Sequence, residues 1–337
     1  MRVLHAPVNM AGQATIISES LQKLGVESDV LLFNRHPFGY SGEKSLDLKK
    51  RRLLGEKIAV LAYNFLRCII DYDIFHFHFG LSLLPKNIDL PVLKLLGKKM
   101  VMHYWGDDIR QNDIAVKYTC LSREDLRELY PERRDELQRK KVEKLNKDVN
   151  ISIVGDFQLL PYSPQSIVIK QVIDLSRWDY VGAEKKPGAV KIVHAPSNQR
   201  IKGTKYILSA INKLIDDGAN IDFVLLENMS NEQVKKHCRE ADIIVDQLLL
   251  ESYGIFAIEC MALGKPVLCR IDDEFIKYYP DVPIMVTDPE NLYENLNKLI
   301  DNAALREDLG RRGRNFVEKV HDSHKIAIQL LELYKSL

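Results

Sequence analysis

The sequence predicts an α/β protein made of two Rossmann-like domains, each a parallel sheet wound with helices. Short β-branched or apolar runs alternate along the whole chain with longer segments of helical period, which is typical of strand–helix units around a parallel sheet. The chain has 337 residues, roughly twice a common single-domain length of about 150. The two halves also begin alike, since residues 3–7 and residues 192–196 both read as a strand followed by the turn His-Ala-Pro.

Each strand is predicted from one of the short runs. In the first half of the chain they cover residues 3–5, 29–33, 74–78, 100–104 and 151–154. In the second half they cover residues 191–194, 222–226, 242–245, 266–269 and 284–286. After the first of these, apolar residues at helical spacing predict an amphipathic helix over residues 206–217, which Gly218 ends.

The join between the domains is predicted between residues 163 and 187, a less periodic stretch with several Pro and Gly residues. We therefore expect an amino-terminal domain over residues 1–172 and a carboxyl-terminal domain over residues 173–337. The last helix is expected to pack back on the amino-terminal domain.

Composition narrows the class of protein. Apolar residues at 46% and charged residues at 28% are ordinary for a globular protein and exclude a disordered or collagen-like chain. With 48 basic and 47 acidic side chains, the chain is too balanced for a protein whose main partner is nucleic acid. Five cysteines without a Cys-x-x-Cys pair indicate buried thiols in a reducing compartment. Neither a leader-like start nor a run of about 18 apolar residues is found, so a cytoplasmic location is expected.

The most specific motif is Glu251-Ser-Tyr-Gly254-Ile255-Phe256-Ala-Ile-Glu259, which continues as Cys-Met-Ala-Leu-Gly-Lys-Pro-Val. Gly254 permits close approach of a ligand, and the amides of Ile255 and Phe256 at the start of a helix can cradle a phosphate. The two carboxylates can then reach a sugar and the hydroxyls of a ribose. Alternatively, Glu251 is solvated and Glu259 only stabilises its helix dipole. The two carboxylates alone do not decide between these interpretations.

Two cations, Arg200 and Lys202, follow the first strand of the second half. At a strand–helix junction they suit a diphosphate, because Arg supplies a bidentate fork and Lys a point charge. A pair of ordinary surface charges is the alternative. Their place at the same sheet edge as the Gly254 turn favours a ligand.

Two loops of the first half also carry candidate residues. Gly12 lies in a strand–helix turn without G-x-G-x-x-G or P-loop spacing, which argues against a nicotinamide or ATP-hydrolysis site. It either approaches a ligand phosphate or only forms the turn. The loop at residues 103–110 gathers His103, Asp108 and Arg110 after a strand, where side chains commonly face a cleft.

One pair of histidines has the spacing of metal ligands. His76 and His78 share one face of a predicted strand. Because no neighbouring Cys or Glu completes a ligand set, they are interpreted as structural, and no metal site is expected.

These motifs resemble those of the group 1 (family 4) retaining glycosyltransferases of the GT-B fold, in which two Rossmann-like domains face each other across a cleft. The resemblance rests on residues 251–267, residues 194–204, Asp246-Gln247 and residues 107–110, and it covers nearly the whole chain. It implies transfer of a sugar from a nucleotide-sugar co-substrate to an acceptor, with retention of anomeric configuration and with no metal ion or other cofactor. The amino-terminal domain would bind the acceptor and the carboxyl-terminal domain the nucleotide sugar.

The resemblance also implies a role for each motif residue. By motif position, Lys202 and Arg200 hold the diphosphate together with Gly254, Ile255, Phe256 and Gly12; Glu259 holds the ribose; Glu251 and His103 are catalytic; Asp108 and Arg110 bind the acceptor. Ser197 stands where the family has an Arg, so Arg200 is expected to replace it. Trp105 stands where the family has a His, and His103 shares its face of the strand.

The acceptor is expected to be a saccharide or lipid-linked saccharide in cell-surface polysaccharide or glycolipid biosynthesis. Residues 44–57 carry six basic against two acidic side chains and precede the apolar run 58–63. This pattern predicts weak contact with the anionic inner face of a membrane, unless the run packs in the core as part of an ordinary helix. Two other functions stay open: a GT-B nucleotide-sugar epimerase, and a catalytically silent nucleotide-sugar-binding protein.

Overall fold

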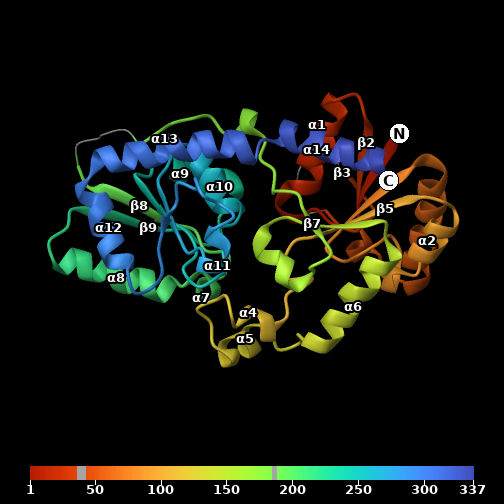
Figure 1. Ribbon diagram of the computed structural model, residues 1–337, viewed down its shortest axis with the longest axis horizontal. Coiled ribbons are helices and arrows are strands. Elements are labelled where there is room, and N and C mark those ends of the chain that lie inside the picture. Colours follow the sequence, from red (N-terminus) through yellow and green to blue (C-terminus); the bar gives the residue numbers. More distant parts are fainter. Residues whose placement is uncertain (36–42, 184–187) are drawn as a thin grey trace. The chain divides into compact units, whose positions relative to one another are not determined.

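Two compact units make up the computed structural model, which describes residues 1–35, 43–183 and 188–337 (Figure 1). The first unit consists of Met1–Ile114, Glu132–Val172 and Ser323–Leu337, and the second of Ala115–Pro131 and Ile173–Asp322. The chain passes from the first unit to the second after Val172. Residues 115–131 nevertheless belong to the second unit, and residues 323–337 belong to the first. Pro187, at the end of the predicted join, lies outside the described residues.

Seven parallel strands form the sheet of the first unit, in the order β3-β2-β1-β4-β5-β6-β7. Their bounds are β1 Arg2–Ala6, β2 Glu27–Leu32, β3 Glu43–Ser45, β4 Ile74–His78, β5 Lys99–Tyr104, β6 Ile151–Val154 and β7 Ile167–Val168. All five strands predicted for this half are present. The edge strands β3 and β7 were not predicted, because runs of three and two residues are too short to show a period.

The helices of the first unit include the last helix of the chain. They are α1 Gln13–Lys23, α2 Leu54–Asp71, α3 Leu90–Leu95, α4 Asn112–Ala115, α6 Asp135–Asp148 and α14 Ser323–Ser336. α14 lies beside α1 (Figure 1), and its buried Leu330 and Tyr334 join Ile17 and Leu21 of α1 in one apolar cluster. Burial of this face holds the carboxyl-terminal residues in the first unit. Within the described residues no helix is both long and apolar enough to cross a bilayer.

Five parallel strands form the sheet of the second unit, in the order β12-β11-β10-β8-β9. Their bounds are β8 Val190–His194, β9 Ile221–Leu225, β10 Ile243–Val245, β11 Val267–Cys269 and β12 Met285–Val286. The helices are α5 Arg123–Leu129, α7 Gln199–Lys202, α8 Thr204–Asp216, α9 Asn231–Glu240, α10 Ile255–Ala262, α11 Asp273–Ile276, α12 Leu292–Asp301 and α13 Ala303–Val320. Each strand predicted for this half is present.

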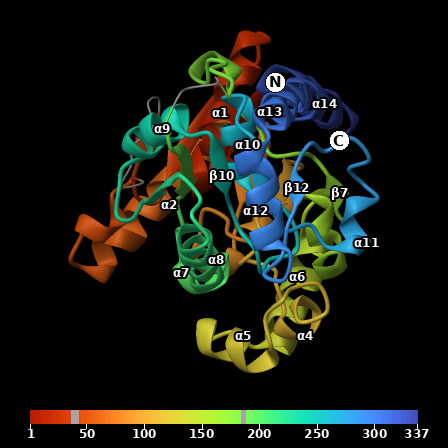
Figure 2. The ribbon, with the colours of Figure 1, turned by 90° about the vertical axis from the view of Figure 1, so that its left-hand side faces the viewer.

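The helix predicted over residues 206–217 is α8, which covers Thr204–Asp216. Its buried face packs against α12, as Figure 2 shows with this unit turned toward the viewer. Gly218 follows in a left-handed conformation, with φ of +88°, which glycine adopts without strain. Because the strands are parallel, the loops that follow β8, β10 and β11 open onto one edge of the sheet.

Candidate functional site

Lys202 is fixed at the carboxyl edge of the second unit's sheet. It ends the short helix α7, whose first turn is capped by the Asn198 side chain, which accepts hydrogen bonds from the amides of Arg200 and Ile201. The Lys202 ammonium lies 2.7 Å from Asp246 Oδ1 and 2.7 Å from Gln247 Oε1. An ammonium carries three N–H donors. Among the described residues it has these two acceptors, so one donor remains for a ligand.

Arg200 points elsewhere, although it lies on the same helix. Its guanidinium pairs with Glu128 of α5 at 2.8 Å, and both side chains are more than half exposed. Residues two apart on a helix face different directions. The structure therefore does not bring Arg200 and Lys202 onto one partner, and a shared role on a diphosphate stays a prediction.

The start of α10 is open, as the motif predicts. Gly254 precedes the helix in an extended conformation, no side chain caps this end, and its first turn has no acidic residue. A Cβ at Gly254 would meet no atom within 4 Å. The amides of Ile255 and Phe256 thus begin a helix whose positive end has room beside it for an anion.

The two carboxylates of the motif lie in different surroundings. Glu259, inside α10, is partly buried, and burial raises its pKa to about 8. Glu251 lies in the loop between β10 and α10, is fully buried, and accepts a hydrogen bond from the amide of Asp272 through its backbone oxygen. The Glu251 side chain is therefore not accessible from solvent in this structure.

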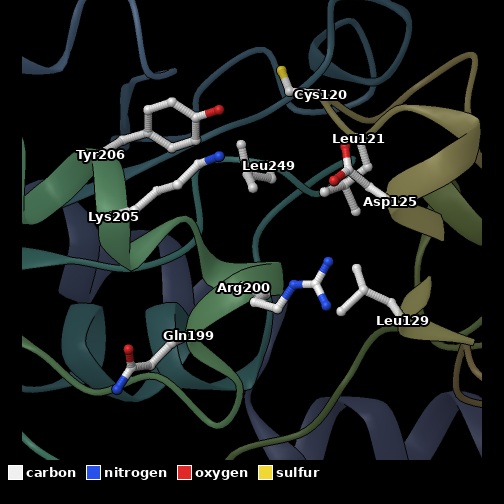
Figure 3. A pocket seen from close by; sticks show the side chains of 9 residues that line it. All are labelled: Cys120, Leu121, Asp125, Leu129, Gln199, Arg200, Lys205, Tyr206 and Leu249. Carbon is white, nitrogen blue, oxygen red and sulfur yellow. The ribbon is translucent and has the colours of Figure 1, made fainter.

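Residues 115–131 are held against this edge by contacts that no motif signals. The amide of Cys120 donates to the carbonyl of Leu249 at 2.9 Å. Arg270, which follows β11, donates to the carbonyls of Tyr118 and Leu250 and forms an ion pair with Asp272 at 2.7 Å. Neither Arg270 nor this segment carries a recognisable spacing, so neither could be predicted from the sequence. Residues of this segment, including α5, line a pocket of about 200 Å³ together with Leu249 and the first turns of α7 and α8 (Figure 3).

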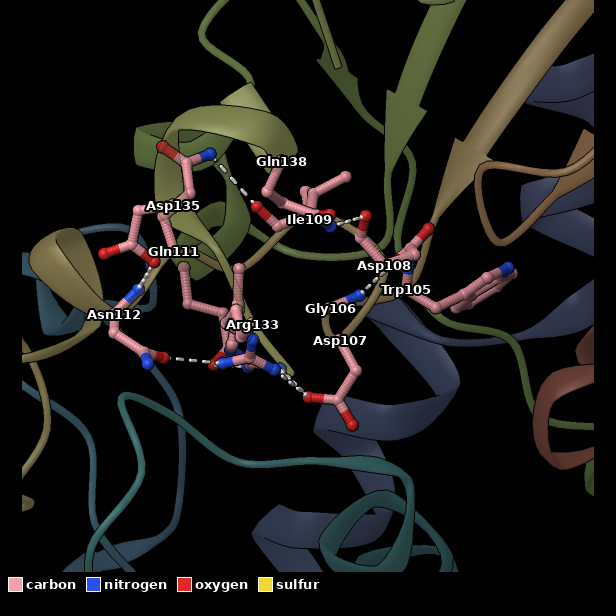
Figure 4. A network of polar contacts seen from close by, with 12 residues as sticks. Trp105, Gly106, Asp107, Asp108, Ile109, Gln111, Asn112, Arg133, Asp135 and Gln138 are labelled. Atoms are coloured by element: carbon pink, nitrogen blue, oxygen red, sulfur yellow. Dashed lines mark hydrogen bonds and ion pairs between the residues drawn. The ribbon is translucent and has the colours of Figure 1, made fainter. Parts of the chain in front are cut away.

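The loop after β5 in the first unit is organised by Asp108 (Figure 4). Its carboxylate accepts hydrogen bonds from the amides of Trp105 at 3.0 Å and Gly106 at 2.8 Å. Burial raises the pKa of Asp108 to about 6. Gly106 has φ of +133°, a backbone conformation that strains any residue with a side chain. Asp108 and Arg110 shape this loop; contact of either with an acceptor stays a prediction.

The neighbouring Asp107 faces the other way and is paired. Arg133 lies 3.3 Å from Asp107 and also donates to Asn112 at 3.2 Å (Figure 4). Asp107 is exposed whereas Asp108 is buried, as expected for neighbours on a chain.

In the same unit, Gly12 precedes α1 with φ of +77°, a conformation that favours glycine. A phosphate contact of Gly12 stays a prediction.

Four buried histidines meet on the first unit's sheet. His5 of β1 pairs in register with His76 of β4, and His78 of β4 pairs with His103 of β5. All four are fully buried, which lowers each pKa and keeps the rings neutral. His5 was not predicted to join the others, because the adjacency of β1 and β4 is not visible in the sequence.

Hydrogen-bond polarity decides what this cluster can do. The Trp105 indole donates to His78 Nδ1 at 3.2 Å, so the proton of neutral His78 lies on Nε2, which donates to His5 Nδ1 at 3.2 Å. His5 is a third ligand that the sequence did not show: one ring nitrogen each of His5, His76 and His78 lie within 4.8 Å of one another, a spacing that could hold a metal ion. In the hydrogen-bonded arrangement above, His78 Nε2 carries a proton and is not available to a metal; a structural role for His78 stays a prediction. His103 stacks on Trp105 with ring centroids 4.0 Å apart and is shielded from solvent. Its catalytic role stays a prediction.

Part of the second unit matches known proteins in sequence. Residues 203–316 match the family model described as glycosyl transferases group 1. Over 141 residues, 35% of this chain, the sequence is 28% identical to an uncharacterised glycosyltransferase of Methanocaldococcus jannaschii. That match spans only 40% of the archaeal protein.

Solved structures resemble the whole chain. Sucrose-phosphate synthase from Thermosynechococcus elongatus superposes with a TM-score of 0.69 at 16% identity, covering 100% of this chain and 99% of that one. HepE of Anabaena, in complex with UDP-glucose, gives 0.65 at 13% identity over 99% of each chain. WaaG, a glycosyltransferase involved in lipopolysaccharide biosynthesis, gives 0.61 at 12% identity over 99% of each. The predicted GT-B fold and the resemblance to group 1 glycosyltransferases are confirmed; family 4 and the retaining mechanism stay predictions.

The buried Asp108 generates a pH-dependent prediction. Its folded pKa of about 6 lies above the usual value of about 4, so between these values the folded state binds more protons and this group's contribution to stability falls as pH rises. Asp108→Asn keeps an acceptor for the two amides and removes the charge. Between pH 4.5 and pH 7 the free energy of unfolding of Asp108→Asn should rise relative to that of wild type by on the order of 2 kcal/mol.

Urea unfolding at the two pH values measures this change. Asp107→Asn, the same substitution at the exposed neighbouring position, is the control and should follow wild type. A pH dependence of Asp108→Asn equal to that of wild type would show that Asp108 is not the group responsible.

Proposed function

Because residues 203–316 match the family model of the group 1 glycosyltransferases and the chain has the GT-B fold, we propose that this protein transfers a sugar from a nucleotide sugar to an acceptor. The transfer proceeds with retention of anomeric configuration and without a metal ion. The observation that carries the proposal is the Lys202 ammonium, held by Asp246 and Gln247 with one donor to spare. The same sheet edge presents the open start of α10.

These groups suit the departure of a nucleoside diphosphate. As the glycosidic bond breaks, negative charge develops on the diphosphate and the sugar becomes oxocarbenium-like. A fixed ammonium and the first amides of α10 face that charge without having to reorganise, and such a preorganised donor is typically worth about 3–4 kcal/mol. These groups offset part of the charge on the leaving diphosphate.

The two carboxylates of the motif bind different parts of the nucleotide sugar. Glu259 is one helical turn inside α10 and accepts hydrogen bonds from the ribose hydroxyls when ionised. Glu251 contacts the donor sugar once the loop that buries it has moved. HepE, of the same fold, is known in complex with UDP-glucose, which supports a nucleotide sugar as the donor here.

The acceptor is a saccharide or a lipid-linked saccharide, and α2 brings the protein to the membrane. One face of α2 is buried through Leu61, Phe65 and Cys68, so that part of the apolar run does pack in the core. The opposite face exposes Tyr63, Leu66 and Ile70, at 61–73%. Gly55 does not interrupt the helix. The basic run at residues 49–52 precedes this face and attracts anionic lipid.

Lys202 gives the first test of the proposal. Lys202→Gln keeps a hydrogen-bond donor for the buried Asp246 but removes the charge, and it should weaken nucleoside diphosphate binding by about tenfold or more, since a charge-assisted contact is worth about 1.5–3 kcal/mol. Calorimetric titration with UDP and with GDP measures the affinity. Lys213→Gln is the control, because Lys213 on α8 lies over the Tyr293 ring.

Unchanged affinity of a folded Lys202→Gln protein would remove Lys202 from the donor site. Arg200→Ala belongs in the same series. A loss of affinity there means that Arg200 leaves Glu128 to join the diphosphate, which costs little because exposed ion pairs contribute only about 0–1 kcal/mol. An unchanged affinity assigns Arg200 to Glu128 alone.

The raised pKa of Glu259 predicts how binding depends on pH. With a pKa of about 8, the carboxylate that accepts ribose hydroxyls is mostly protonated at pH 7 and mostly ionised at pH 8.5. Nucleoside diphosphate affinity should therefore rise about fivefold or more over this interval. Titration calorimetry at both values measures the rise, and Glu259→Gln should abolish it.

Glu251→Gln separates the two carboxylates. It should leave nucleoside diphosphate affinity within about twofold while it slows hydrolysis or transfer of the donor sugar. If Glu251→Gln and Glu259→Gln change affinity equally and leave turnover intact, the division of roles is wrong.

The exposed face of α2 predicts salt-sensitive membrane binding. Vesicles with about 30% phosphatidylglycerol should sediment the protein at low salt, because each basic side chain near an anionic surface contributes about 1 kcal/mol. Pure phosphatidylcholine vesicles should not. Leu66→Ser with Ile70→Ser should reduce binding, whereas Ile215→Ser, an exposed apolar site on α8, should not. Equal sedimentation with both lipids at low salt would leave a soluble acceptor as the better account.

A further inference from the structure

The pocket beside α5 lies wholly within the second unit and is built from segments far apart in the sequence (Figure 3). Its volume is about 200 Å³, below the range of roughly 300–1,000 Å³ for pockets that take drug-sized ligands. Such a space suits a ligand of monosaccharide size better than a whole nucleotide. Leu121, Leu129 and Leu249 give it apolar walls, which can pack on the C–H faces of a sugar ring.

Lys205 is the cation of the pocket that is free to bind an anion. It lies in the first turn of α8, at the positive end of the helix dipole. Within the described part of the chain its ammonium makes a cation–π contact with Tyr206, 4.7 Å from the ring centroid, and no ion pair within 4 Å. Arg200 also lines the pocket but is paired with Glu128. The pocket therefore presents an ammonium whose hydrogen-bond donors are unused.

Asp125 supplies a fixed acceptor on the opposite wall. It forms a capping box with Ser122 at the start of α5, in which its carboxylate accepts from the Ser122 amide at 3.0 Å. That hydrogen bond, together with the Ser122 side chain, lowers the pKa of Asp125, so it stays ionised at neutral pH. A carboxylate with spare lone pairs accepts hydrogen bonds from hydroxyls. A ligand with an anionic group toward Lys205 and hydroxyls toward Asp125 would form hydrogen bonds with both side chains.

We infer that this pocket binds an anionic monosaccharide, either a sugar phosphate or a uronic acid. The claim stands on the pocket itself and does not depend on the proposed function. The pocket adjoins the donor loop, since Leu249 lies between Gln247, which contacts Lys202, and Glu251. The hydrogen bond from Cys120 to Leu249 links α5's segment to that same loop.

Cys120 provides a readout at the site. It lines the pocket and is exposed, whereas the other four cysteines are buried. A maleimide should therefore label Cys120, and Cys120→Ser should abolish the labelling. Glucose 6-phosphate or glucuronate should slow labelling of wild type several-fold, and comparison of the two tells which anion is preferred. Glucose and inorganic phosphate, which each lack one half of the ligand, should protect at least about tenfold less well at equal concentration.

Variants locate the charge. Lys205→Ala should raise the glucose 6-phosphate concentration needed for half protection by about tenfold, and Lys205→Arg should restore most of the effect. Lys213→Ala, on the same helix but outside the pocket, should match wild type. Lys205→Ala should leave UDP or GDP affinity unchanged, because the diphosphate is bound by Lys202.

The outcomes separate this inference from the proposed function. No protection by either anionic sugar, or equal protection by glucose or by inorganic phosphate, overturns the inference even when a nucleoside diphosphate binds normally. Protection that persists in Lys205→Ala also overturns it. If the sugar phosphate protects Cys120 but no nucleoside diphosphate binds, the proposed function is wrong and the pocket keeps its ligand class.

Discussion

The contact between Asp246 and Lys202 is the interaction on which the second unit's site depends. Asp246 is 1% exposed at the end of β10, and a buried carboxylate is tolerated only when it is paired. Lys202 pairs with it, and the amide of Leu248 donates to the Lys202 carbonyl at 3.2 Å. Together these contacts fix α7 against the loop that leads to α10. One pairing requirement thus places a cation and an open helix end at the same edge of the sheet.

The first strand of each sheet, β1 and β8, ends in the same string, His-Ala-Pro, but the histidine has different partners in the two units. His194, at the end of β8, donates to the Val245 carbonyl at 2.8 Å and accepts from the Thr204 hydroxyl at 2.9 Å, so both ring nitrogens have partners. His5, at the end of β1, instead joins the buried cluster of four histidines, where its Nε2 has no partner among the described residues. In the second unit this histidine links β8 to the end of β10 and to the start of α8. In the first it contacts His78, which accepts a hydrogen bond from Trp105.

The sequence predicted every strand with a run long enough to show a period, together with α8 and the open start of α10, because these depend on local pattern. It did not predict β3, β7 or the place of residues 115–131, which depend on neighbours supplied by the fold. The same limit applies to Arg200: its place in the loop was visible, but its ion pair with Glu128 requires α5 to lie nearby. Glu251 has the predicted spacing, yet its burial follows from the loop around it.

The central claim is that a fixed ammonium and helix amides bind a diphosphate without a metal. Calorimetric titration of wild-type protein with UDP and UMP, or GDP and GMP, in EDTA and again in magnesium, tests it most directly. The account predicts that the diphosphate binds about tenfold or more tightly than the monophosphate in EDTA, because the second phosphate gains charge-assisted contacts, and that magnesium adds little. Equal affinity for the two nucleotides, or binding of the diphosphate only in magnesium, would contradict it.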